Sequence, residues 1–414
     1  MKIVILGAGV VGTAAAYYLG RDGHEVVVVD RQKDVAVETS WGNAGLVSPG
    51  DSTSWASPAA LRTFVKALFR KDLGIKVRPT LDPHFFTWSL RFLMQCSRKR
   101  ADANSALKLR LALHSRECIN ALQQHTGIRY ADLRKGILYF FRTPESLEAG
   151  IKHMRFISEH GIAFEVVDPN RVVELDPGLA AAKDQIAGAL YSPMDQTGDS
   201  NLFSRNLAQW CREHLNVTFQ LDTLIEGLDI EANRVRAIKT SRGLIPCDAA
   251  VLSMGAEGAL LSRKIGVHLP IYPVKGYSAT IPIDDDKGPT LGGADEDRLV
   301  AYSRLGNRLR VASTAEFAGY DRSWTRENFN SIFKTAHDLF PGVIDESKAQ
   351  LWAGLRPMMP ASVPVHGKAK YDNLYLDTGH GHVGWTMACG SGQFLSDLIA
   401  GRKTEIDPTG LLYA

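Results

Sequence analysis

Apolar and glycine-rich stretches at the start of the chain predict a strand, a turn, a helix and a second strand. Lys2–Leu6 is a short run rich in β-branched residues, too short for a globular helix, and predicts a buried parallel strand. Residues 7–12 (GAGVVG) complete a GxGxxG turn, and residues 13–19 continue with helix-tolerant side chains. Glu25–Val29 predicts a second buried strand that ends on Asp30.

This first unit has the chemistry of a dinucleotide site. Gly7 permits a tight turn, Gly9 lets the main chain approach a pyrophosphate, and Gly12 lets helix and strand pack closely. The N-terminus of the helix offers unpaired N–H groups to the anion. Asp30, about twenty residues after the glycines, can accept hydrogen bonds from both ribose hydroxyls. A chance glycine turn is the alternative, but the strands, the helix and the acid together favour a dinucleotide.

The loop after the second strand, residues 38–45 (ETSWGNAG), is polar and rich in glycine. A plain surface connection is one interpretation. In a doubly wound fold, however, this loop lies at the carboxyl edge of the sheet, where Ser, Asn and Gly can donate to phosphate oxygens. We therefore expect it to contact the dinucleotide.

Two stretches have the periodicity of basic amphipathic helices. Residues 58–78 place apolar side chains on one face with lysines and arginines around them, and residues 89–124 form a second basic helical stretch. Core-packed helices with solvated charged faces are one interpretation. The other is a docking surface for anionic lipid, to which each nearby cation contributes about 1 kcal/mol.

The middle of the chain alternates short strands and helices, which predicts an inserted α+β domain. The predicted elements are strands at 136–141, 164–167 and 188–191, a helix at 144–161, a turn region at 168–179, and a helix at 200–215 that the acidic turn 195–199 caps.

Two later regions complete the predicted architecture. Residues 217–240 read as short strands, and residues 248–256 as a buried strand that ends at Gly255 and opens a helix. Gly255 is either a second glycine turn facing the same crevice or a structural turn. Residues 268–354 return to strand character, with one helix at 325–339, and predict an antiparallel sheet that walls a substrate pocket.

The last block of the chain has the same predicted order of strand, glycine-rich turn and helix as the first. Residues 374–377 predict a strand, residues 378–386 (TGHGHVGWT) a glycine-rich turn, and residues 387–400 a helix. A helix N-terminus stabilises negative charge by roughly 0.3–1 kcal/mol in exposed cases. Such a terminus suits the anionic N1/C2 edge of a reduced flavin, and no second GxGxxG for NAD lies near the middle of the chain. FAD is therefore the expected cofactor.

The predicted fold is α/β: a discontinuous Rossmann-type FAD-binding domain with an inserted α+β substrate domain built on an antiparallel sheet. The FAD-binding domain is expected at residues 1–75, 195–265 and 355–414, and the substrate domain at residues 76–194 and 266–354.

Composition narrows the function classes. The 414 residues are 45% hydrophobic and 22% charged, and their formal net charge of +3 is too balanced to indicate nucleic-acid binding. No apolar run has the length of a membrane span, and the first strand follows Met1 directly, so we expect no signal peptide and a cytoplasmic protein. The five cysteines lack CxxC spacing and predict reduced thiols. His380 and His382 have no carboxylate or third ligand at a suitable spacing, so no metal is expected.

Seven motifs give the chain a family resemblance that runs nearly from end to end. They are VILGAGVVG at 4–12, ETSWGNAGLVSPG at 38–50, QTGDSNLF at 196–203, YPVKGYS at 272–278, NRLRV at 307–311, WAGLRPMMP at 352–360 and TGHGHVGWTMACGSGQ at 378–393. With them the chain resembles the FAD-dependent amine and amino-acid oxidoreductases, which include D-amino acid oxidase, glycine oxidase and sarcosine oxidase, and most of all their bacterial D-amino acid dehydrogenase branch.

The resemblance implies a set of FAD-binding residues. Those on the adenosine and pyrophosphate are Gly7, Gly9, Val10, Val11, Gly12, Asp30 and Arg31. Those near the pyrophosphate and flavin are Ser40, Asn43, Ala44, Gly45, Leu46 and Gly255. Those along the isoalloxazine edge are Gly379, His380, Gly381, His382, Gly384, Trp385 and Thr386.

The resemblance also implies a substrate site beside the flavin. Arg356 matches the arginine that grips the substrate carboxylate, and a guanidinium independently offers a bidentate fork that fixes which hydrogen on Cα faces flavin N5. A surface or ion-paired arginine is the alternative. Tyr277 and Tyr302 are further candidates for pocket walls or carboxylate contacts. Lys275 is expected either near the flavin or in an ordinary salt bridge.

The reaction implied by the resemblance is oxidative deamination. FAD accepts a hydride from Cα of a D-amino acid, and water hydrolyses the imino acid to a 2-oxo acid and ammonia, or the imino acid stays cyclic for a proline-type substrate. Electrons are expected to pass to a quinone at the cytoplasmic face of the inner membrane, with oxygen as the alternative acceptor. The sequence offers no convincing His/Asp pair for acid–base catalysis.

One departure from the family pattern bears on the substrate. Ala361 and Ser362 stand where this branch tends to have an Asp-Gly pair, which favours a narrower substrate such as D-proline or a hydroxylated D-proline. The non-enzymatic alternative is an FAD-holding subunit of a larger complex. Homo-oligomerisation and covalent attachment of FAD are left open, although Cys389 is expected to point into the core.

Overall fold

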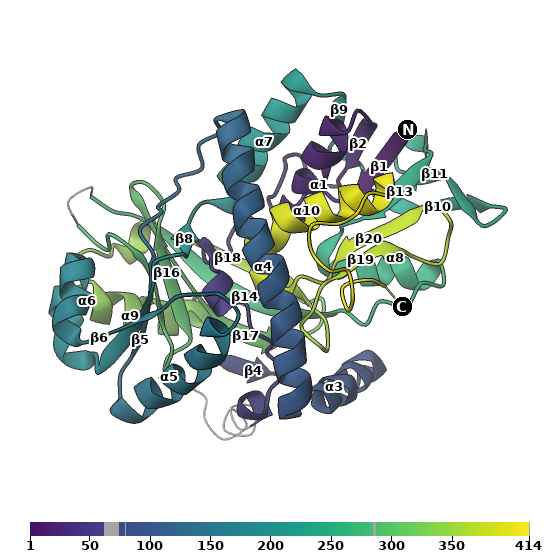
Figure 1. Ribbon diagram of the computed structural model, residues 1–414. Helices are drawn as coiled ribbons and strands as arrows, with labels where there is room; N and C mark the ends of the chain where they lie inside the picture. The colour runs from purple at the N-terminus through teal and green to yellow at the C-terminus, as the bar shows by residue number, and fades with distance from the viewer. Residues whose placement is uncertain (62–73, 79, 285–286, 414) are drawn as a thin grey trace.

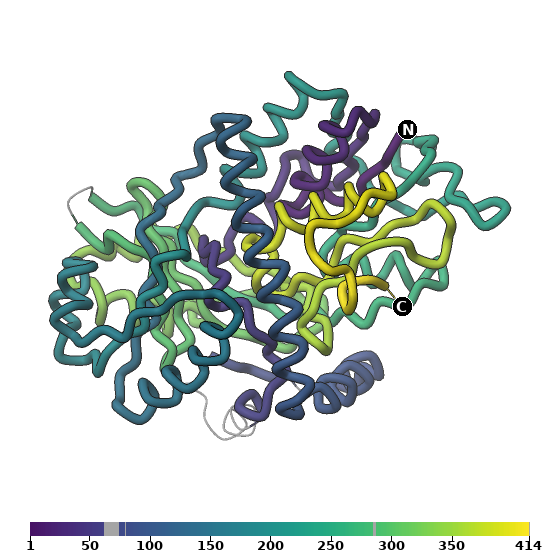
Figure 2. The backbone as a smooth tube through the Cα atoms, in the orientation of Figure 1, coloured from purple at the N-terminus to yellow at the C-terminus, as the bar shows by residue number. Residues whose placement is uncertain are grey.

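The protein consists of two sheets side by side with helices around them (Figure 1). This computed structural model describes residues 1–61, 74–78, 80–284 and 287–413. The chain crosses from one sheet to the other and back more than once, so each sheet is built from segments far apart in the sequence (Figure 2). The predicted α/β fold, with a discontinuous nucleotide-type sheet and an inserted α+β part, is confirmed.

The nucleotide-type sheet has six strands in the order β19-β20-β13-β1-β2-β9. They are β1 (Lys2–Leu6), β2 (Glu25–Val29), β9 (Val217–Gln220), β13 (Ala249–Leu252), β19 (Val365–Lys368) and β20 (Leu374–Thr378). All pairings except β19 with β20 are parallel. Because β1 is central and parallel to both neighbours, the turns that follow β1, β13 and β20 come out at one edge of the sheet.

Both faces of this sheet are covered, which explains its uninterrupted apolar strands. Ile3 and Ile5 pack toward a helical layer, whereas Val4 and Leu6 pack toward a second, smaller sheet. The helical layer contains α1 (Val10–Arg21), α4 (Arg98–Thr126), α7 (Ser200–His214) and α10 (Gly384–Ala400), and the other face carries β10 (Ile225–Glu231), β11 (Arg234–Thr240), β12 (Gly243–Pro246) and α8 (Gly258–Lys264).

The predicted helix at 89–124 is wrong as a single element, because the chain forms two helices there. α3 (Pro83–Gln95) ends at Cys96, and Ser97, in an extended conformation, is the N-cap of α4. A serine before a helical run favours a helix start over continuation. α4 then packs along α10 and crosses the molecule (Figure 1).

The predicted helix at 58–78 lies only partly within the described residues. Residues 58–61 are helical, and residues 62–73 lie outside the described chain. Ile75–Val77 forms strand β4 instead, paired in parallel with β17, so the end of the helix prediction is wrong. Two β-branched residues, Ile75 and Val77, flank Lys76 here and suit a pleated strand better than a helix.

The larger sheet is mainly antiparallel, as predicted, and runs β18-β14-β17-β16-β15-β5-β7-β6, with β4 beside β17. Its further strands are β5 (Ile137–Phe141), β6 (Glu165–Val167), β7 (Gly188–Ser192), β14 (Tyr272–Pro282), β15 (Gly292–Asp295), β16 (Val300–Arg304), β17 (Arg308–Phe317) and β18 (Gln350–Met358). A separate pair joins β3 (Leu46–Val47) to β8 (Gln196–Thr197). Strand β15 is absent from the sequence prediction because its residues, GGAD, include no β-branched side chain.

Three helices pack against the larger sheet: α5 (Pro144–Ser158), α6 (Pro169–Leu175) and α9 (Asn330–Leu339). The prediction of a turn region at 168–179 is wrong, since it contains α6. Asp168 caps that helix by accepting a hydrogen bond from the Arg171 amide, and Pro169 occupies its first turn.

Among the described helices, none combines the length and apolar character needed to cross a bilayer.

Strand β18 connects the two halves of the molecule. It pairs with β14 along its length, and its last residue, Met358, bridges to His380 beside the smaller sheet. The predicted domain boundary at residue 355 falls inside this strand. The domain limits therefore stay a prediction, but Arg356 lies on the strand that both halves share.

Candidate active site

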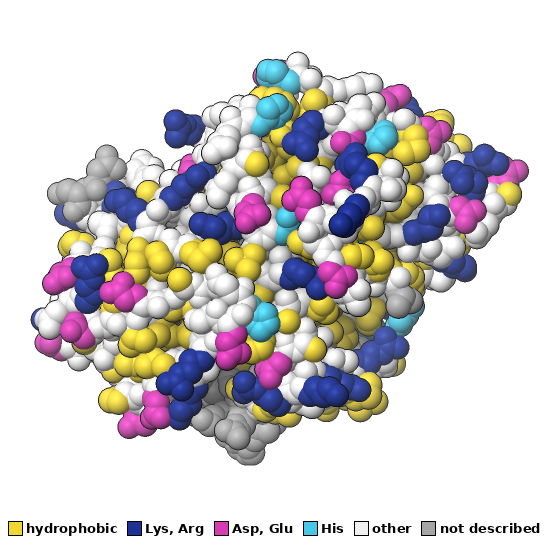
Figure 3. Space-filling model, viewed as in Figure 1, with side chains coloured by type: hydrophobic (Ala, Val, Ile, Leu, Met, Phe, Trp, Pro, Cys, Tyr) yellow, Lys and Arg dark blue, Asp and Glu magenta, His cyan; other side chains and the backbone are white. Residues whose placement is uncertain are grey.

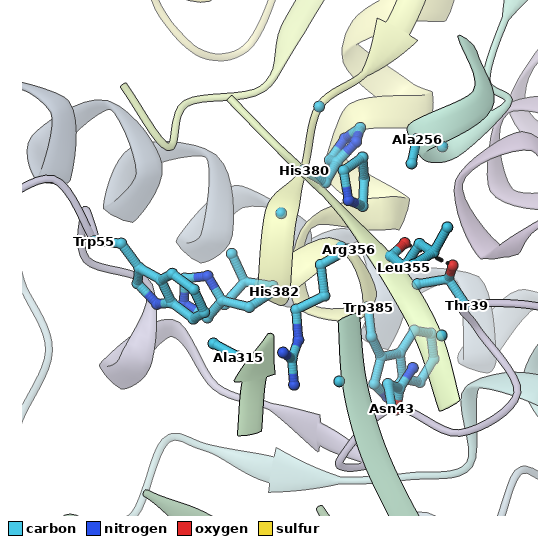
Figure 4. Close-up of a pocket in the computed structure, with 18 of the residues that line it drawn as sticks. Thr39, Asn43, Trp55, Ala256, Ala315, Leu355, Arg356, His380, His382 and Trp385 are labelled. Atoms are coloured by element: carbon cyan, nitrogen blue, oxygen red, sulfur yellow. Dashed lines mark hydrogen bonds between the residues drawn. The ribbon is translucent and has the colours of Figure 1, made fainter. Parts of the chain in front are cut away.

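A cavity of about 1250 Å³ lies between the two sheets and collects most of the predicted site (Figure 4). The predicted residues that line it are Gly7, Gly9, Val10, Val11, Asp30, Arg31, Ser40, Asn43, Ala44, Leu46, Gly255, Tyr277, Arg356, Gly379, His380, Gly381, His382, Gly384, Trp385 and Thr386. Gly12, Gly45, Tyr302 and Lys275 are not part of its lining. The volume exceeds that of a typical pocket for one drug-sized ligand, so a dinucleotide and a small substrate fit together.

The glycine turn after β1 is shaped to approach a ligand closely. Gly7 has φ +107°, and a Cβ there would lie 2.7 Å from the Ser253 carbonyl oxygen. A Cβ at Gly12 would lie 2.0 Å from the Gly7 carbonyl oxygen, so Gly12 serves the packing of turn and helix rather than the ligand. At the start of helix α1 the Val10 amide donates to Ser40 Oγ at 3.1 Å, and Gly9 at the N-cap has no side chain, so the other N–H groups of the first turn are suited to a pyrophosphate.

Asp30 holds the turn and faces the cavity. Its carboxylate accepts hydrogen bonds from the Ala8 amide at 2.7 Å and from the Gln32 amide at 2.8 Å. Burial raises the pKa of Asp30, although these two hydrogen bonds oppose the rise. Each oxygen keeps a second lone pair, so the carboxylate can also accept from a ribose diol.

Arg31 belongs to a ring of four charges at the nucleotide end of the cavity. It bonds Glu38 at 2.5 Å and Glu257 at 2.5 Å, and Arg322 bonds the same two carboxylates at 2.9 and 2.7 Å. Burial alone would raise the pKa of Glu38, but hydrogen bonds from Arg322, Gln32 and Arg31 lower it. The sequence analysis missed Glu257 and Arg322, since both lie more than 200 residues from Arg31 along the chain.

The loop at 38–45 is held by its own polar side chains. The Asn43 side chain accepts a hydrogen bond from the Gly45 amide at 2.8 Å and donates to Ser200 Oγ at 2.5 Å. The Thr39 hydroxyl donates to the Leu355 carbonyl at 2.9 Å (Figure 4). These contacts leave the backbone of the loop, rather than the Asn43 amide, to face a ligand.

The glycine-rich segment at 378–386 is shorter than predicted, because α10 starts at Gly384 and not at 387. Trp385 and Thr386 therefore belong to the first turn of the helix. Trp385 donates to the Gly198 carbonyl at 3.1 Å, and Thr386 Oγ1 accepts from the Ser48 amide at 3.1 Å. Both side chains tie neighbouring loops to the helix, while the N-terminus of α10 opens on the cavity.

His380 lies in a buried cluster that the sequence analysis did not foresee. Asp377 Oδ1 lies 3.4 Å from His366 Nε2 and 3.5 Å from His380 Nε2, so the premise that His380 has no carboxylate or third ligand nearby is wrong. The Ser391 hydroxyl bonds both rings, at 3.1 and 2.8 Å. Burial raises the pKa of Asp377 and lowers that of both histidines, which favours a neutral hydrogen-bonded network. This network fixes the start of the glycine-rich segment.

Arg356 is a partly buried cation that, among the described residues, uses only Nη1 as a hydrogen-bond donor. Its Nη1 donates to the Thr314 carbonyl at 2.7 Å, and a Cβ at Gly276 would lie 2.4 Å from Nη2. Burial lowers the pKa of Arg356 to about 10, which leaves it charged at neutral pH. Within the described part of the chain, no carboxylate lies within 4 Å of the guanidinium. The guanidinium points into the cavity (Figure 4) and is open to an anion.

The partner of Arg356 on β17 has an unusual backbone. Thr314 has φ +71°, which is rare for a β-branched residue, at a register shift between β14 and β17. The irregularity coincides with the carbonyl that orients Arg356. Strain of this kind is found at functional sites when the surrounding structure enforces it.

The three other predicted substrate-side residues have different surroundings. Tyr277 lines the cavity, but its hydroxyl donates to Glu316. Tyr302 is fully buried in the core of the larger sheet, edge-on to Phe340 at 5.1 Å, and so does not line the cavity. Lys275 is also buried, and Nζ lies 3.3 Å from Asp321, which fits the salt-bridge alternative.

The cavity beside Arg356 is lined by further residues that the sequence analysis did not single out. Trp55 stacks on His382, with ring centroids 4.7 Å apart. Asp51 and Glu296 present carboxylates, and burial raises the pKa of Asp51 to about 6 and that of Glu296 to about 8. No local pattern marks these residues, because the fold brings them together from separate segments.

Fold and cavity define an enzyme that holds a dinucleotide beside a small-molecule pocket, and comparisons with known proteins agree. The FAD dependent oxidoreductase family model matches residues 2–398. Over 414 residues, all of both chains, the sequence is 64% identical to D-amino acid dehydrogenase 2 of Mesorhizobium japonicum. It is 44% identical to the D-amino acid dehydrogenase of Chromohalobacter salexigens, covering 99% of this chain and 98% of the relative. A solved structure of glycine oxidase from Geobacillus kaustophilus has a TM-score of 0.78 at 20% identity, covering 100% and 98%.

The chain therefore belongs to the FAD dependent oxidoreductase family, as its motifs suggested. FAD is its cofactor, and the residues present fit that group. The start of α1, where Gly9 at the N-cap has no side chain, suits the pyrophosphate, and Asp30 suits the ribose. The N-terminus of α10, reached through Gly379 and Gly381 with positive φ, suits the flavin edge.

Proposed function

We propose that the protein is a D-amino acid dehydrogenase that converts D-amino acids to imino acids and, after hydrolysis, to 2-oxo acids and ammonia. The observation that carries the proposal is the partly buried guanidinium of Arg356 in the flavin cavity, which has no carboxylate partner among the described residues. The 64% identity to D-amino acid dehydrogenase 2 supports the same substrate class. One cavity is lined both by the glycine motif and by Arg356, which argues against a subunit that only holds FAD.

Each side of the cavity has its own task in this reaction. FAD, when bound, supplies the hydride acceptor. Arg356 binds the substrate carboxylate bidentately, which fixes how Cα faces the cofactor. The Thr314 carbonyl holds Arg356 in place, and the enclosing strands β14, β17 and β18 exclude water from the reacting carbon.

The direct test is anaerobic. The purified yellow protein is mixed with D- and L-amino acids, including proline, hydroxyproline and glycine, while the flavin absorption is followed. Bleaching by D-amino acids alone is the expected result. Bleaching by L-amino acids only, or by no amine, would contradict the proposal.

A narrower function, oxidation of D-proline or hydroxy-D-proline, is favoured by the turn at 361–362. The Ser362 hydroxyl accepts from the Trp55 amide at 3.1 Å, and the Ala361 carbonyl accepts from the Ser54 hydroxyl at 3.2 Å. The residues that depart from the family pattern thus position Trp55, whose ring is a flat apolar wall for a cyclic side chain. The ratio of reduction rates for D-proline and D-alanine tests this candidate.

We further propose that electrons pass to a quinone at the membrane surface. Helix α3 leaves four large apolar side chains more than half exposed, Phe86, Leu90, Leu93 and Met94. Basic residues border them, and Figure 3 shows apolar and basic side chains together over α3 at the lower right. An apolar face rimmed by cations suits the surface of an anionic membrane.

The membrane proposal predicts cosedimentation with anionic vesicles and faster turnover with a quinone in those vesicles. The double variant Leu90→Glu/Met94→Glu, at two exposed residues of α3 that do not line the cavity, should lose both effects and keep flavin reduction by substrate. Stoichiometric peroxide from the wild type, with no response to quinone, would favour oxygen as the acceptor.

A further inference from the structure

His382 is a partly buried histidine whose two ring nitrogens are shielded from solvent. It lies on the short 3₁₀ turn Gly381–Val383, lines the cavity and stacks on Trp55 with an interplanar angle of 27°. Among the described residues, neither ring nitrogen makes a hydrogen bond of good geometry, and only the backbone of Asp51 comes near one of them. A buried polar group without a partner is costly unless a ligand supplies one. The ring is therefore positioned for something that enters the cavity.

His382 and Arg356 belong to the same part of the cavity. Figure 4 shows the imidazole beside the arginine, with Trp55 on the far side of the imidazole. A D-amino acid carries its carboxylate and its ammonium group on one carbon. A carboxylate held by Arg356 brings the ammonium group close to the guanidinium, where a neutral acceptor is needed and a second cation would repel it.

The surroundings of His382 keep it neutral. Burial lowers its pKa well below the usual value, and the cations Lys108 on α4 and Arg356 on β18 lower it further, against an opposing effect of the Asp51 backbone. The Asp51 carboxyl and Lys108 face each other near this site, and burial raises the pKa of Asp51 and lowers that of Lys108. A neutral imidazole always has one nitrogen with a free lone pair.

We propose that His382 accepts a proton from the substrate ammonium group before the Cα–H bond breaks. An N–H bond of the ammonium breaks, and the proton joins a ring nitrogen of His382. The freed nitrogen lone pair then forms the C=N bond as hydride leaves Cα for FAD, and His382 returns its proton to solvent when the imino acid departs. The inference rests on the proposed function and assigns the acid–base residue that the sequence did not reveal.

The test compares wild-type holoenzyme with His382→Asn and His382→Ala in anaerobic flavin reduction by a D-amino acid across pH. General base catalysis is typically worth about 10²–10⁴-fold. We expect His382→Asn to slow reduction by about that factor at pH 7, and the deficit to shrink as pH approaches the pKa of the substrate amine. Added imidazole should partly restore reduction in His382→Ala.

Three controls separate this role from packing. FAD content and the affinity for propionate, which has the carboxylate but no amine, should match wild type in both variants. His214→Asn, an exchange at an exposed histidine on α7, should leave the pH profile unchanged. His268→Asn, a second exchange at an exposed histidine that does not line the cavity, should also leave the profile unchanged.

Other outcomes have distinct meanings. If His382→Asn shows the wild-type pH profile, or if it loses propionate binding and FAD together, the inference is overturned and His382 has a structural role. If no D-amino acid reduces the wild type, the proposed function itself has failed.

Discussion

The two ends of the cavity are built in opposite ways. At the nucleotide end, a short continuous motif lines the cavity, and the nearby charges, such as Arg31 and Glu38, are already paired. At the substrate end, side chains from separate segments meet, and Arg356 and His382 have hydrogen-bonding capacity that no described residue uses. The first end recognises a constant shape. At the second end, the proposed substrate would supply a carboxylate for Arg356 and a proton for His382.

The largest effect is expected at the substrate end, from Arg356. Removing one partner of a buried, hydrogen-bonded charge pair costs roughly 2–5 kcal/mol. Arg356→Ala should therefore lower kcat/KM for a D-amino acid by roughly 30- to 4000-fold, and Arg356→Lys should fall between this variant and wild type because it keeps the charge without the fork. Steady-state kinetics with an artificial acceptor measure the effect. Equal FAD content in all three proteins is the control, and a change below threefold would contradict the role of Arg356.

At the nucleotide end, two neighbouring glycines should respond differently. Gly7→Ala places a methyl group 2.7 Å from a carbonyl oxygen at φ +107°, so it should destabilise the fold itself by roughly 1–3 kcal/mol. Gly9→Ala meets only Ser40 Oγ, at 3.5 Å, so the apoprotein should keep its stability. Its FAD affinity should nevertheless fall by roughly tenfold or more, because the methyl group lies where the pyrophosphate approaches.

Thermal unfolding of the apoproteins and titration with FAD distinguish the two glycine variants. Unchanged FAD affinity in Gly9→Ala would show that the pyrophosphate does not approach this position. Loss of apoprotein stability in Gly9→Ala would show that Gly9, like Gly7, serves the fold.

The same contrast explains how far the sequence could be interpreted. Gly7, Gly9 and Asp30 line the cavity and could be singled out from the sequence, because turn, helix start and strand end lie within 30 residues and follow from local pattern. Trp55 and Glu296 are missed, since only the packing of distant segments brings them to the cavity.

Some errors came from local patterns that tertiary structure overrides. Tyr302 has the residue type of a pocket wall, but the alternation of β16 turns it into the core. The carboxylate beside His380 is Asp377 on β20, and the second histidine of the cluster is His366 on β19, which pairs with β20. Periodicity alone also predicts α3 and α4 as one helix, although Ser97 is the N-cap at which α4 begins.

The acidic group Glu296 predicts a pH dependence at the substrate end. Burial, with Asp51, Asp295 and Asp297 nearby, raises its pKa to about 8 in the folded protein, so the folded state holds a proton that the unfolded chain releases at a lower pH. Stability is therefore lost as pH rises from the unfolded pKa toward 8. Glu296→Gln removes this loss and should stabilise the protein on the order of 1 kcal/mol at pH 8, and little at pH 4.

Urea unfolding at pH 4, 6 and 8 checks the Glu296 prediction. Asp338, which bonds Arg298 at 2.6 Å, offers a matched control. Because Asp338→Asn removes an ion pair, it should not be more stable than wild type at any of the three pH values. A constant difference between Glu296→Gln and wild type at all three pH values would contradict the raised pKa.

The smallest effect is expected from the four-charge ring, where the charges are already satisfied and partly solvated. Arg322 is 39% exposed, and surface pairs of this kind are worth about 0.2–1 kcal/mol. Arg322→Gln should therefore weaken FAD binding less than fivefold at low salt, because Glu38 and Glu257 remain paired to Arg31. At high salt the difference should disappear, since the exposed pairs are screened. FAD titrations at about 50 and about 500 mM salt, below and above physiological ionic strength, measure the difference in FAD affinity between Arg322→Gln and wild type. If Arg322→Gln loses as much FAD affinity as Gly9→Ala, FAD binding depends on the charge of Arg322. The nucleotide end would then rely on side-chain charge as the substrate end does, and the contrast between the two ends would fail.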